Sequence, residues 1–199
     1  MILWLPDSAT LNDDRYHNTH PWGRICYDKE NVTRLTQNKT YCSAVQNSKY
    51  QPSSLLDKVP YPNPFHNNHD MFLDLVDSAI LHYIITNADR KTNWVNNGIY
   101  QNLFVMLDNG KSFQDPGRDE WLLLAPLFQC CRVRQTTYER LRVLEKGVLS
   151  SVMREVLKAD PVSPVLTDPH LTAMDRRLAH VILEIQECAR TQGPSHVFR

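Results

Sequence analysis

An amphipathic pattern over residues 69–85 most constrains what this chain can fold into. Apolar side chains recur there at i, i+3 and i+4 spacing, which predicts a helix with one buried face. This helix runs directly into "TNADRKTNW" at 86–94, and a strand-like run, "LFVML" at 103–107, leads into "LDNG" at 107–110. The order helix, acidic loop, strand, acidic loop leaves Asp89 and Asp108 each just beyond the end of a predicted element, 19 positions apart.

The remainder of the second half reads as helical. We expect helices over 121–129, interrupted or entered near Pro126, then over 135–144 and 148–158 with Gly147 between them. A last helix has Thr167 or Asp168 as its cap and ends before "GP" at 193–194. The predicted fold is mainly α with a small β element. Residues 1–68 form a loop-rich first part with a remnant strand at 1–5, and residues 69–199 form the principal domain.

Composition narrows the class of protein. The 199 residues suffice for one domain or for part of a larger protein, and Lys+Arg and Asp+Glu are balanced at 22 each. This balance argues against a basic nucleic-acid binder, and no apolar run has the length of a membrane span. The first residues lack the features of a signal peptide, so we expect an N-terminally incomplete chain.

Cysteines and sequons indicate a secretory protein. The five cysteines fit no zinc spacing, and a bond between the adjacent Cys130 and Cys131 would be strained, although each could pair outward with a different partner. Asn31-Val-Thr and Asn38-Lys-Thr are candidate glycosylation sites, although either match alone is as readily due to chance. Taken together these features favour an oxidising compartment.

The two acidic loops are suited to phosphoryl transfer. This chemistry needs one acid that orients the substrate hydroxyl and another that holds a divalent metal on the nucleotide phosphates. Protein kinases carry these acids in a catalytic loop and in an Asp-x-Gly motif after a strand, as Asp89 and Asp108 would be here. Asp-Asn-Gly is also a common turn and "NADR" would serve to end a helix, so the pattern alone leaves a structural explanation open.

Longer stretches carry a family resemblance. "LWLPD", "HPWGR", "YCSAV", "NADR", "LDNGKSF", "DEWLLLAPLFQCCRVRQTTYERL", "DPVSPVLTDPHL" and "DRRL" together span most of the chain. The sequence resembles the secretory-pathway kinases that include the Golgi casein kinase and glycosaminoglycan xylosylkinase. "NADR", "HPW" and "DPVSPVLTDPHL" are closer to the xylosylkinase branch.

The resemblance implies an atypical kinase C-lobe that uses ATP. It assigns Asp89 as the catalytic acid and Asp108 as a ligand of Mn²⁺ or Mg²⁺, between which the oxygen donors do not discriminate. Asn93 and Asn109 are candidates for metal binding or loop support. The implied reaction is phosphorylation of xylose in the proteoglycan linkage region, with a secreted protein as the other candidate acceptor.

The family's disulfide pattern would pair Cys42 with Cys130 and Cys131 with Cys188, which leaves Cys26 over. The resemblance also implies a Golgi-lumenal or secreted glycoprotein that functions in proteoglycan biosynthesis, and a homodimer or a heterodimer with a related kinase is a further candidate assembly. No nucleic-acid partner and no transmembrane segment in this chain are expected.

The chain departs from the family pattern beside the catalytic acid. The family continues Asp-Arg-His-His-Tyr-Glu, whereas this chain has "DRKTNW", so that Trp94 stands where the family has Glu. Thr86 and Gln114 occupy positions where the family usually has Gly. Upstream of Asp89 no Gly-rich loop or phosphate-binding Lys is evident, so the N-lobe is largely absent and we expect little activity from this chain alone.

Three interpretations therefore stand beside one another. The first is the C-lobe of a xylosylkinase-like enzyme, the second a catalytically dead pseudokinase that acts as a binding or allosteric partner, and the third a disulfide-stapled helical domain without a site. The remaining features have plain structural explanations. We expect "DRRL" at 175–178 to be a helix surface pair beside a buried Leu, and Trp121 to be a packing residue.

Overall fold

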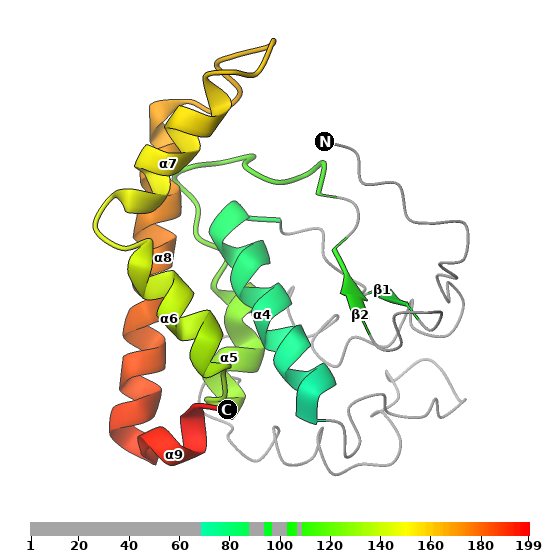
Figure 1. Ribbon diagram of the computed structural model, residues 1–199, viewed down its shortest axis with the longest axis vertical. Coiled ribbons are helices and arrows are strands. Elements are labelled where there is room, and N and C mark those ends of the chain that lie inside the picture. The colour runs from blue at the N-terminus through cyan, green and yellow to red at the C-terminus, as the bar shows by residue number, and fades with distance from the viewer. Residues whose placement is uncertain (1–68, 88–93, 97–102, 107–108) are drawn as a thin grey trace.

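The computed structural model describes residues 69–87, 94–96, 103–106 and 109–199 (Figure 1). The predictions for residues 1–68, which include the strand at 1–5, the sequons and Cys26 and Cys42, lie outside these ranges. Within them the chain is mainly helical, with one small β hairpin, as the sequence predicted. None of the helices in the described ranges combines the length and the apolar character needed to cross a membrane.

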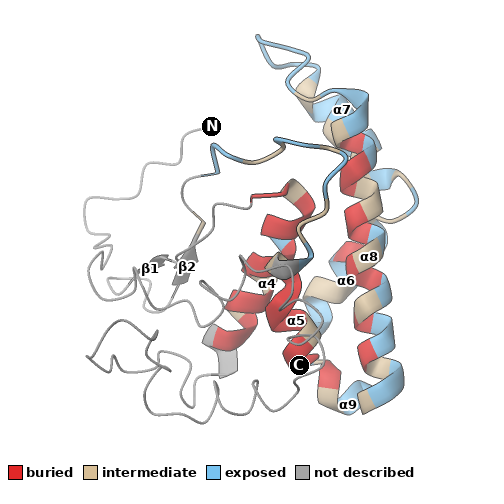
Figure 2. Cartoon of the chain, turned by 180° about the vertical axis from the view of Figure 1, so that it is seen from behind, coloured by how far each residue is buried: buried red, intermediate tan, exposed pale blue. Residues whose placement is uncertain are grey.

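Helix α4 (His69–Ile85) lies at the centre of the fold and contacts α5, α8, the 3₁₀ turn η2 and strand β2. Its predicted apolar stripe is buried, and Ser78 and His82, which lie off that stripe, are buried as well. Figure 2 shows buried positions along most of its length. A helix that is covered on several sides in this way is a core helix, and burial of its large apolar side chains is worth about 1.5–3 kcal/mol each. Those side chains are Phe72, Leu75, Val76, Ile80, Tyr83 and Ile84.

Strands β1 (Trp94–Asn96) and β2 (Leu103–Val105) form a two-stranded antiparallel sheet. In its register Trp94 pairs with Val105 and Asn96 with Leu103. The strand predicted at 103–107 is therefore present as a shorter element. The pairing strand β1 was not predicted, because three residues after a polar loop carry no periodicity of their own.

The predicted helix at 121–129 consists of two elements. A 3₁₀ turn, η2 (Trp121–Leu124), leads into α5 (Ala125–Cys130), with Pro126 in the first turn, where a missing N–H costs nothing. Helices α6 (Gln135–Val143) and α7 (Val148–Leu157) follow as predicted. Gly147 joins them with a φ of 84°, in the left-handed region that glycine adopts readily.

Helix α8 (Asp168–Gln192) is the longest element and packs against α4, α5, α6 and α7 (Figure 1). Thr167 holds the N-cap position, but its Oγ1 lies 2.7 Å from Nδ1 of His170 and makes no capping bond to the helix backbone. Gly193 ends α8, as the sequence predicted, and the short helix α9 (Pro194–Val197) follows. The buried stripe of α8 comprises Leu171, Met174, Leu178, Val181, Ile182, Ile185 and Cys188.

A disulfide and a β bridge attach the C-terminal part of the chain to the helical core. A disulfide joins Cys131, at the end of α5, to Cys188 near the end of α8, and this is the pairing that the resemblance implies. Cys130 is disulfide-bonded as well, with its partner outside the described residues. Beside these cysteines Val133 pairs with Phe198 in a parallel bridge. Helix α8 is therefore fixed covalently to α5 at its C-terminal end.

Candidate active site

The structure describes the segments that flank the two acidic loops. Asp89, Asn93 and Asp108, which the sequence assigned to catalysis or metal binding, lie outside the described residues. The end of α4, both strands and the turn that begins at Asn109 are described. Trp94, the departure from the family pattern, begins strand β1 and pairs through its backbone with β2. The described part of the candidate site therefore consists of the segments that flank the two acidic loops.

The end of α4 has an unusual backbone conformation. The N–H of Thr86 donates to the carbonyl of Tyr83 at 3.1 Å, and the N–H of Asn87 donates to the carbonyl of His82 at 2.9 Å. This bond pair is the Schellman arrangement, in which the residue at the position of Thr86 is left-handed and is usually Gly. Thr86 has a φ of 54°, and its buried Oγ1 has no hydrogen-bond partner in the part of the chain that the structure describes.

Two contacts join the end of α4 to the turn after β2. The side-chain amide of Asn87 donates to Oδ1 of Asn109 at 3.1 Å, and the N–H of Phe113 donates to the carbonyl of Ile85 at 2.8 Å. The amide of Asn109 also donates to the carbonyl of Met106 at 3.2 Å. The structure therefore brings together the segments that precede Asp89 and follow Asp108.

These contacts bear on how the residues fit a metal. Oδ1 of Asn109 accepts a hydrogen bond from Asn87, so this amide supports the loop in the structure. The motif "LDNG" also carries the carboxylate of Asp108, a donor type that would suit a hard divalent cation such as Mn²⁺ or Mg²⁺. The chemistry of the donor set thus fits the metal that the resemblance implies.

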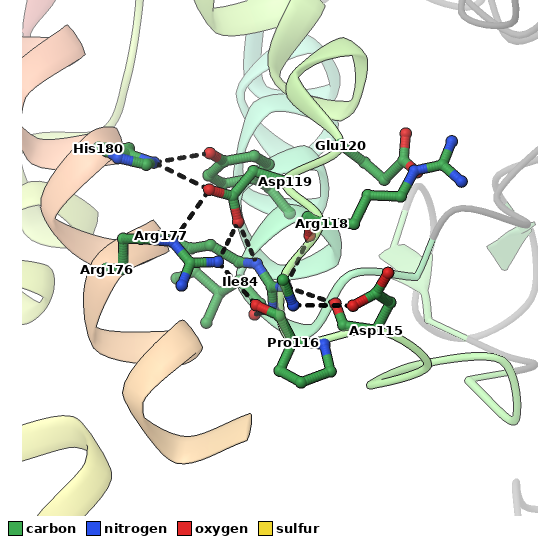
Figure 3. A network of polar contacts seen from close by, with 11 residues as sticks. Ile84, Asp115, Pro116, Arg118, Asp119, Glu120, Arg176, Arg177 and His180 are labelled. Atoms are coloured by element: carbon green, nitrogen blue, oxygen red, sulfur yellow. Dashed lines mark hydrogen bonds and ion pairs between the residues drawn. The ribbon is translucent and has the colours of Figure 1, made fainter. Parts of the chain in front are cut away.

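Arg177 organises the segment that follows this turn (Figure 3). Its side chain is 1% exposed, and Nε donates to Oδ1 of Asp119 at 2.9 Å. The remaining guanidinium nitrogens donate to the backbone carbonyls of Ile84, Asp115 and Arg118. One buried side chain of α8 thereby holds the end of α4 against the loop at 115–119. The prediction that "DRRL" is a surface pair is wrong for Arg177, because these acceptors compensate for its burial.

Asp119 is the acidic partner of this cluster. Arg176 also reaches it, with Nη2 2.7 Å from Oδ1. Burial alone would raise the pKa of Asp119, but the hydrogen bonds from Arg176 and Arg177 outweigh it, and the pKa lies below its usual value. A carboxylate that is ionised and shared by two guanidinium groups forms strong charge-assisted hydrogen bonds. The ion pairs of Asp119 with Arg176 and Arg177 are consequently formed at neutral pH.

An aromatic cluster completes this side of the site. The Tyr83 hydroxyl lies 2.9 Å from Nδ1 of His180, and the ring of His180 lies 4.5 Å from that of Trp121 between centroids. Burial, and next the charge of Asp119, raise the pKa of Tyr83. Burial is also the main reason why the pKa of His180 is lowered, with Asp119 opposing and Arg176 reinforcing the shift. Trp121 packs against the rings of Tyr83, Phe128 and His180 and is 39% exposed, so its assignment as a packing residue stays a prediction.

Sequence reasoning missed the residues that build this frame. Arg177 lies three positions after Met174 and four before Val181, so it occupies the buried stripe of α8, and a charged residue there was the available signal. Asn87 offered no signal of this kind, because a contact between residues 22 positions apart depends on how α4 and the hairpin pack.

Comparison with known proteins identifies the family. The sequence profile described as "Golgi casein kinase, C-terminal, Fam20" matches residues 1–197. The solved structure titled "The structure of hydra Fam20 with sugar" superposes with a TM-score of 0.78 at 32% identity, covering 100% of this chain and 51% of that one. A structure of the Golgi casein kinase with Mn/ADP bound gives a TM-score of 0.70 at 29% identity, over 98% of this chain and 44% of that one. The chain belongs to the Fam20 family and has its kinase-like fold.

Curated relatives place the chain within that family. Glycosaminoglycan xylosylkinase from Danio rerio is 40% identical and the human protein 38% identical, each over 97% of this chain and 42% of the relative. The human extracellular serine/threonine protein kinase FAM20C is 33% identical over 97% of this chain and 30% of its own length. The predicted resemblance to the xylosylkinase branch is confirmed. The chain spans less than half of the length of these relatives.

Proposed function

We propose that this chain is the C-terminal lobe of an ATP-dependent xylosylkinase of the secretory pathway. The proposal is carried by two contacts between the end of α4 and the turn after β2. Asn87 bonds to Asn109, and Ile85 bonds to Phe113. These contacts join the segments that lie next to Asp89 and Asp108 in the sequence. The higher identity to glycosaminoglycan xylosylkinases supports the acceptor, a xylose in the proteoglycan linkage region.

The proposed chemistry assigns one role to each acid. Asp89 orients the 2-hydroxyl of xylose and takes its proton as the oxygen attacks the γ-phosphorus of ATP. The new bond joins that oxygen to phosphorus, the bond between the γ-phosphorus and the bridging oxygen breaks, and ADP leaves. Asp108 holds the divalent cation, which supplies charge neutralisation at the phosphates when it is bound. The Golgi casein kinase structure with Mn/ADP bound supports ATP and Mn²⁺ as the nucleotide and metal.

Because little transfer is expected from this chain alone, the test joins it to the N-lobe of a related xylosylkinase and assays phosphorylation of a xylose-containing linkage oligosaccharide. Asp89→Asn keeps the shape of the side chain but removes its basicity, and Asp108→Asn weakens the metal ligand. We expect each change to abolish measurable phosphate transfer while urea unfolding stays close to that of the wild type. Transfer that survives Asp89→Asn would refute the catalytic assignment. A casein substrate in parallel reactions separates the glycan acceptor from a secreted protein acceptor.

A second candidate function rests on Trp94. This residue begins β1 at the position where the family has Glu, and an indole offers no oxygen to a cation. The chain would then be a pseudokinase that acts as a binding or allosteric partner of a related kinase, as a homodimer or heterodimer. Nucleotide and Mn²⁺ binding without phosphate transfer, together with association with an active family member in sedimentation, would favour this function. Trp94→Glu tests it directly, since restored transfer would identify this residue as the cause.

We also propose the Golgi lumen or the extracellular space as the compartment. The disulfide between Cys131 and Cys188 supports an oxidising environment. Asn31 and Asn38 would be glycosylated there, and the test is a loss of mass on treatment with an N-glycosidase. Unchanged mass for the secreted wild type would refute both glycosylation sites.

A further inference from the structure

A pair of asparagine side chains bridges the two segments that flank the acidic loops. The side chain of Asn87 is fully buried, and its amide donates to Oδ1 of Asn109. The amide of Asn109 in turn donates to the carbonyl of Met106, on the far side of residues 107 and 108. The side chain of Asn109 thus joins Met106, which precedes residues 107 and 108 in the sequence, to the end of α4 through Asn87.

Both asparagines are held through their backbones as well. The N–H of Asn87 is bonded to His82 of the last turn of α4, and the carbonyl of Asn109 accepts from the N–H of Ser112 at 3.0 Å. Phe113 then reaches back to Ile85. With backbone anchors on both sides, the amide contact has little freedom to rearrange, so its loss would loosen one segment against the other.

We propose that the Asn87–Asn109 contact is a positioning contact that fixes the metal ligand Asp108 relative to the catalytic acid Asp89. This inference rests on the proposed function, which assigns those two roles. Asp108 directly precedes Asn109, and Asp89 lies two residues beyond Asn87. A neutral amide pair links the segments without adding a charge beside the metal. Partners that orient a metal ligand in this way commonly change metal affinity by about 10–100-fold when they are removed.

The contact can be tested through metal binding, without phosphate transfer. Free Mn²⁺ is titrated by electron paramagnetic resonance in the presence of ADP for Asn87→Ala, for Asn109→Ala and for the double variant, each in the chain joined to the same N-lobe. We expect each single change to weaken Mn²⁺ binding by about ten-fold or more. Asn109→Ala removes the contact with Asn87 and also the bond to Met106, so adding Asn87→Ala should weaken binding no further than Asn109→Ala does alone. Asn109 is exposed, so its substitution keeps the test usable if Asn87→Ala does not fold.

Two controls decide between the outcomes. Ile185→Val lowers stability in the core of α8, away from the turn, and should leave Mn²⁺ affinity unchanged. Asp108→Ala should abolish binding. If Asp108→Ala binds like the wild type, or the wild type does not bind Mn²⁺ with ADP, the metal assignment fails and the positioning role fails with it. If Asp108→Ala loses binding but the asparagine variants keep it, the positioning role alone is overturned. Losses that multiply in the double variant, or an equal loss in Ile185→Val, also overturn it.

Discussion

Thr86→Gly should stabilise this protein, although the change removes a buried side chain. Thr86 is left-handed with a φ of 54°, which costs a residue with a Cβ roughly 1–2 kcal/mol. Its buried hydroxyl, which lacks a partner among the described residues, adds about 1 kcal/mol. Loss of the buried methyl costs about 0.8 kcal/mol, and the greater freedom of unfolded glycine costs roughly 0.5–1 kcal/mol. The net expectation is a gain of about 1 kcal/mol.

Urea unfolding followed by circular dichroism measures this gain. With a slope near 2 kcal/mol per molar urea, the midpoint should rise by about 0.5 M. Thr86→Ala removes the hydroxyl and the methyl but keeps the Cβ, so it should remain close to the wild type. Thr172→Gly makes the same replacement at an exposed position inside α8 and should lower the stability by several tenths of a kcal/mol, roughly the difference in helix propensity. If Thr86→Gly is no more stable than Thr86→Ala, the argument from backbone strain is wrong.

Three further perturbations have defined outcomes. Arg177→Met should cost about 3–5 kcal/mol, because it leaves the carbonyls of Ile84, Asp115 and Arg118 without this donor and leaves Asp119 paired with Arg176 alone. Arg176→Met, at a side chain 39% exposed, should cost under about 1 kcal/mol, and urea unfolding compares the two variants. Burial lowers the pKa of His180 in the folded protein, so as the pH drops below 6.5 the unfolded chain takes up a proton at this side chain before the folded protein does. The free energy of unfolding should therefore fall with pH in this range. His180→Gln should reduce that fall in unfolding experiments at several pH values. Replacing both Cys131 and Cys188 by serine should lower the thermal midpoint. The disulfide closes a loop of 57 positions, and its loss should destabilise the folded state by about 4 kcal/mol because the unfolded chain gains entropy. An unchanged midpoint would contradict this.

Periodicity was sufficient to locate the long helices, because burial imposes a repeat that the sequence displays. Helix α8 shows this most clearly, since its stripe from Leu171 to Cys188 is buried as the spacing indicates. Short elements carry no such repeat, so β1 was missed and the start of α5 was placed only approximately. These elements exist because neighbouring segments pair with them.

The sequence predicted the two acids of the candidate site but not the side chains that hold the surrounding segments together. Asp89 and Asp108 follow recognisable motifs, and their assignment stays a prediction. The charge of Arg177 indicates a surface residue, whereas its position in the buried stripe of α8 indicates the burial that the structure has. Asn87 depends on a tertiary contact that local patterns do not encode. Polar residues that satisfy buried backbone groups are thus the ones that sequence reasoning underestimates.

The spacing of two attachments on helix α8 constrains how its sequence can change during evolution. Arg177 grips the loop at 115–119, and eleven residues later Cys188 forms the disulfide to Cys131. Eleven residues are close to three helical turns, about 16 Å, so both attachments project from nearly the same side of the helix. One inserted or deleted residue between them would rotate one attachment by about 100° relative to the other. Homologues that keep both residues should therefore tolerate substitutions at the exposed positions of this interval but no change in its length.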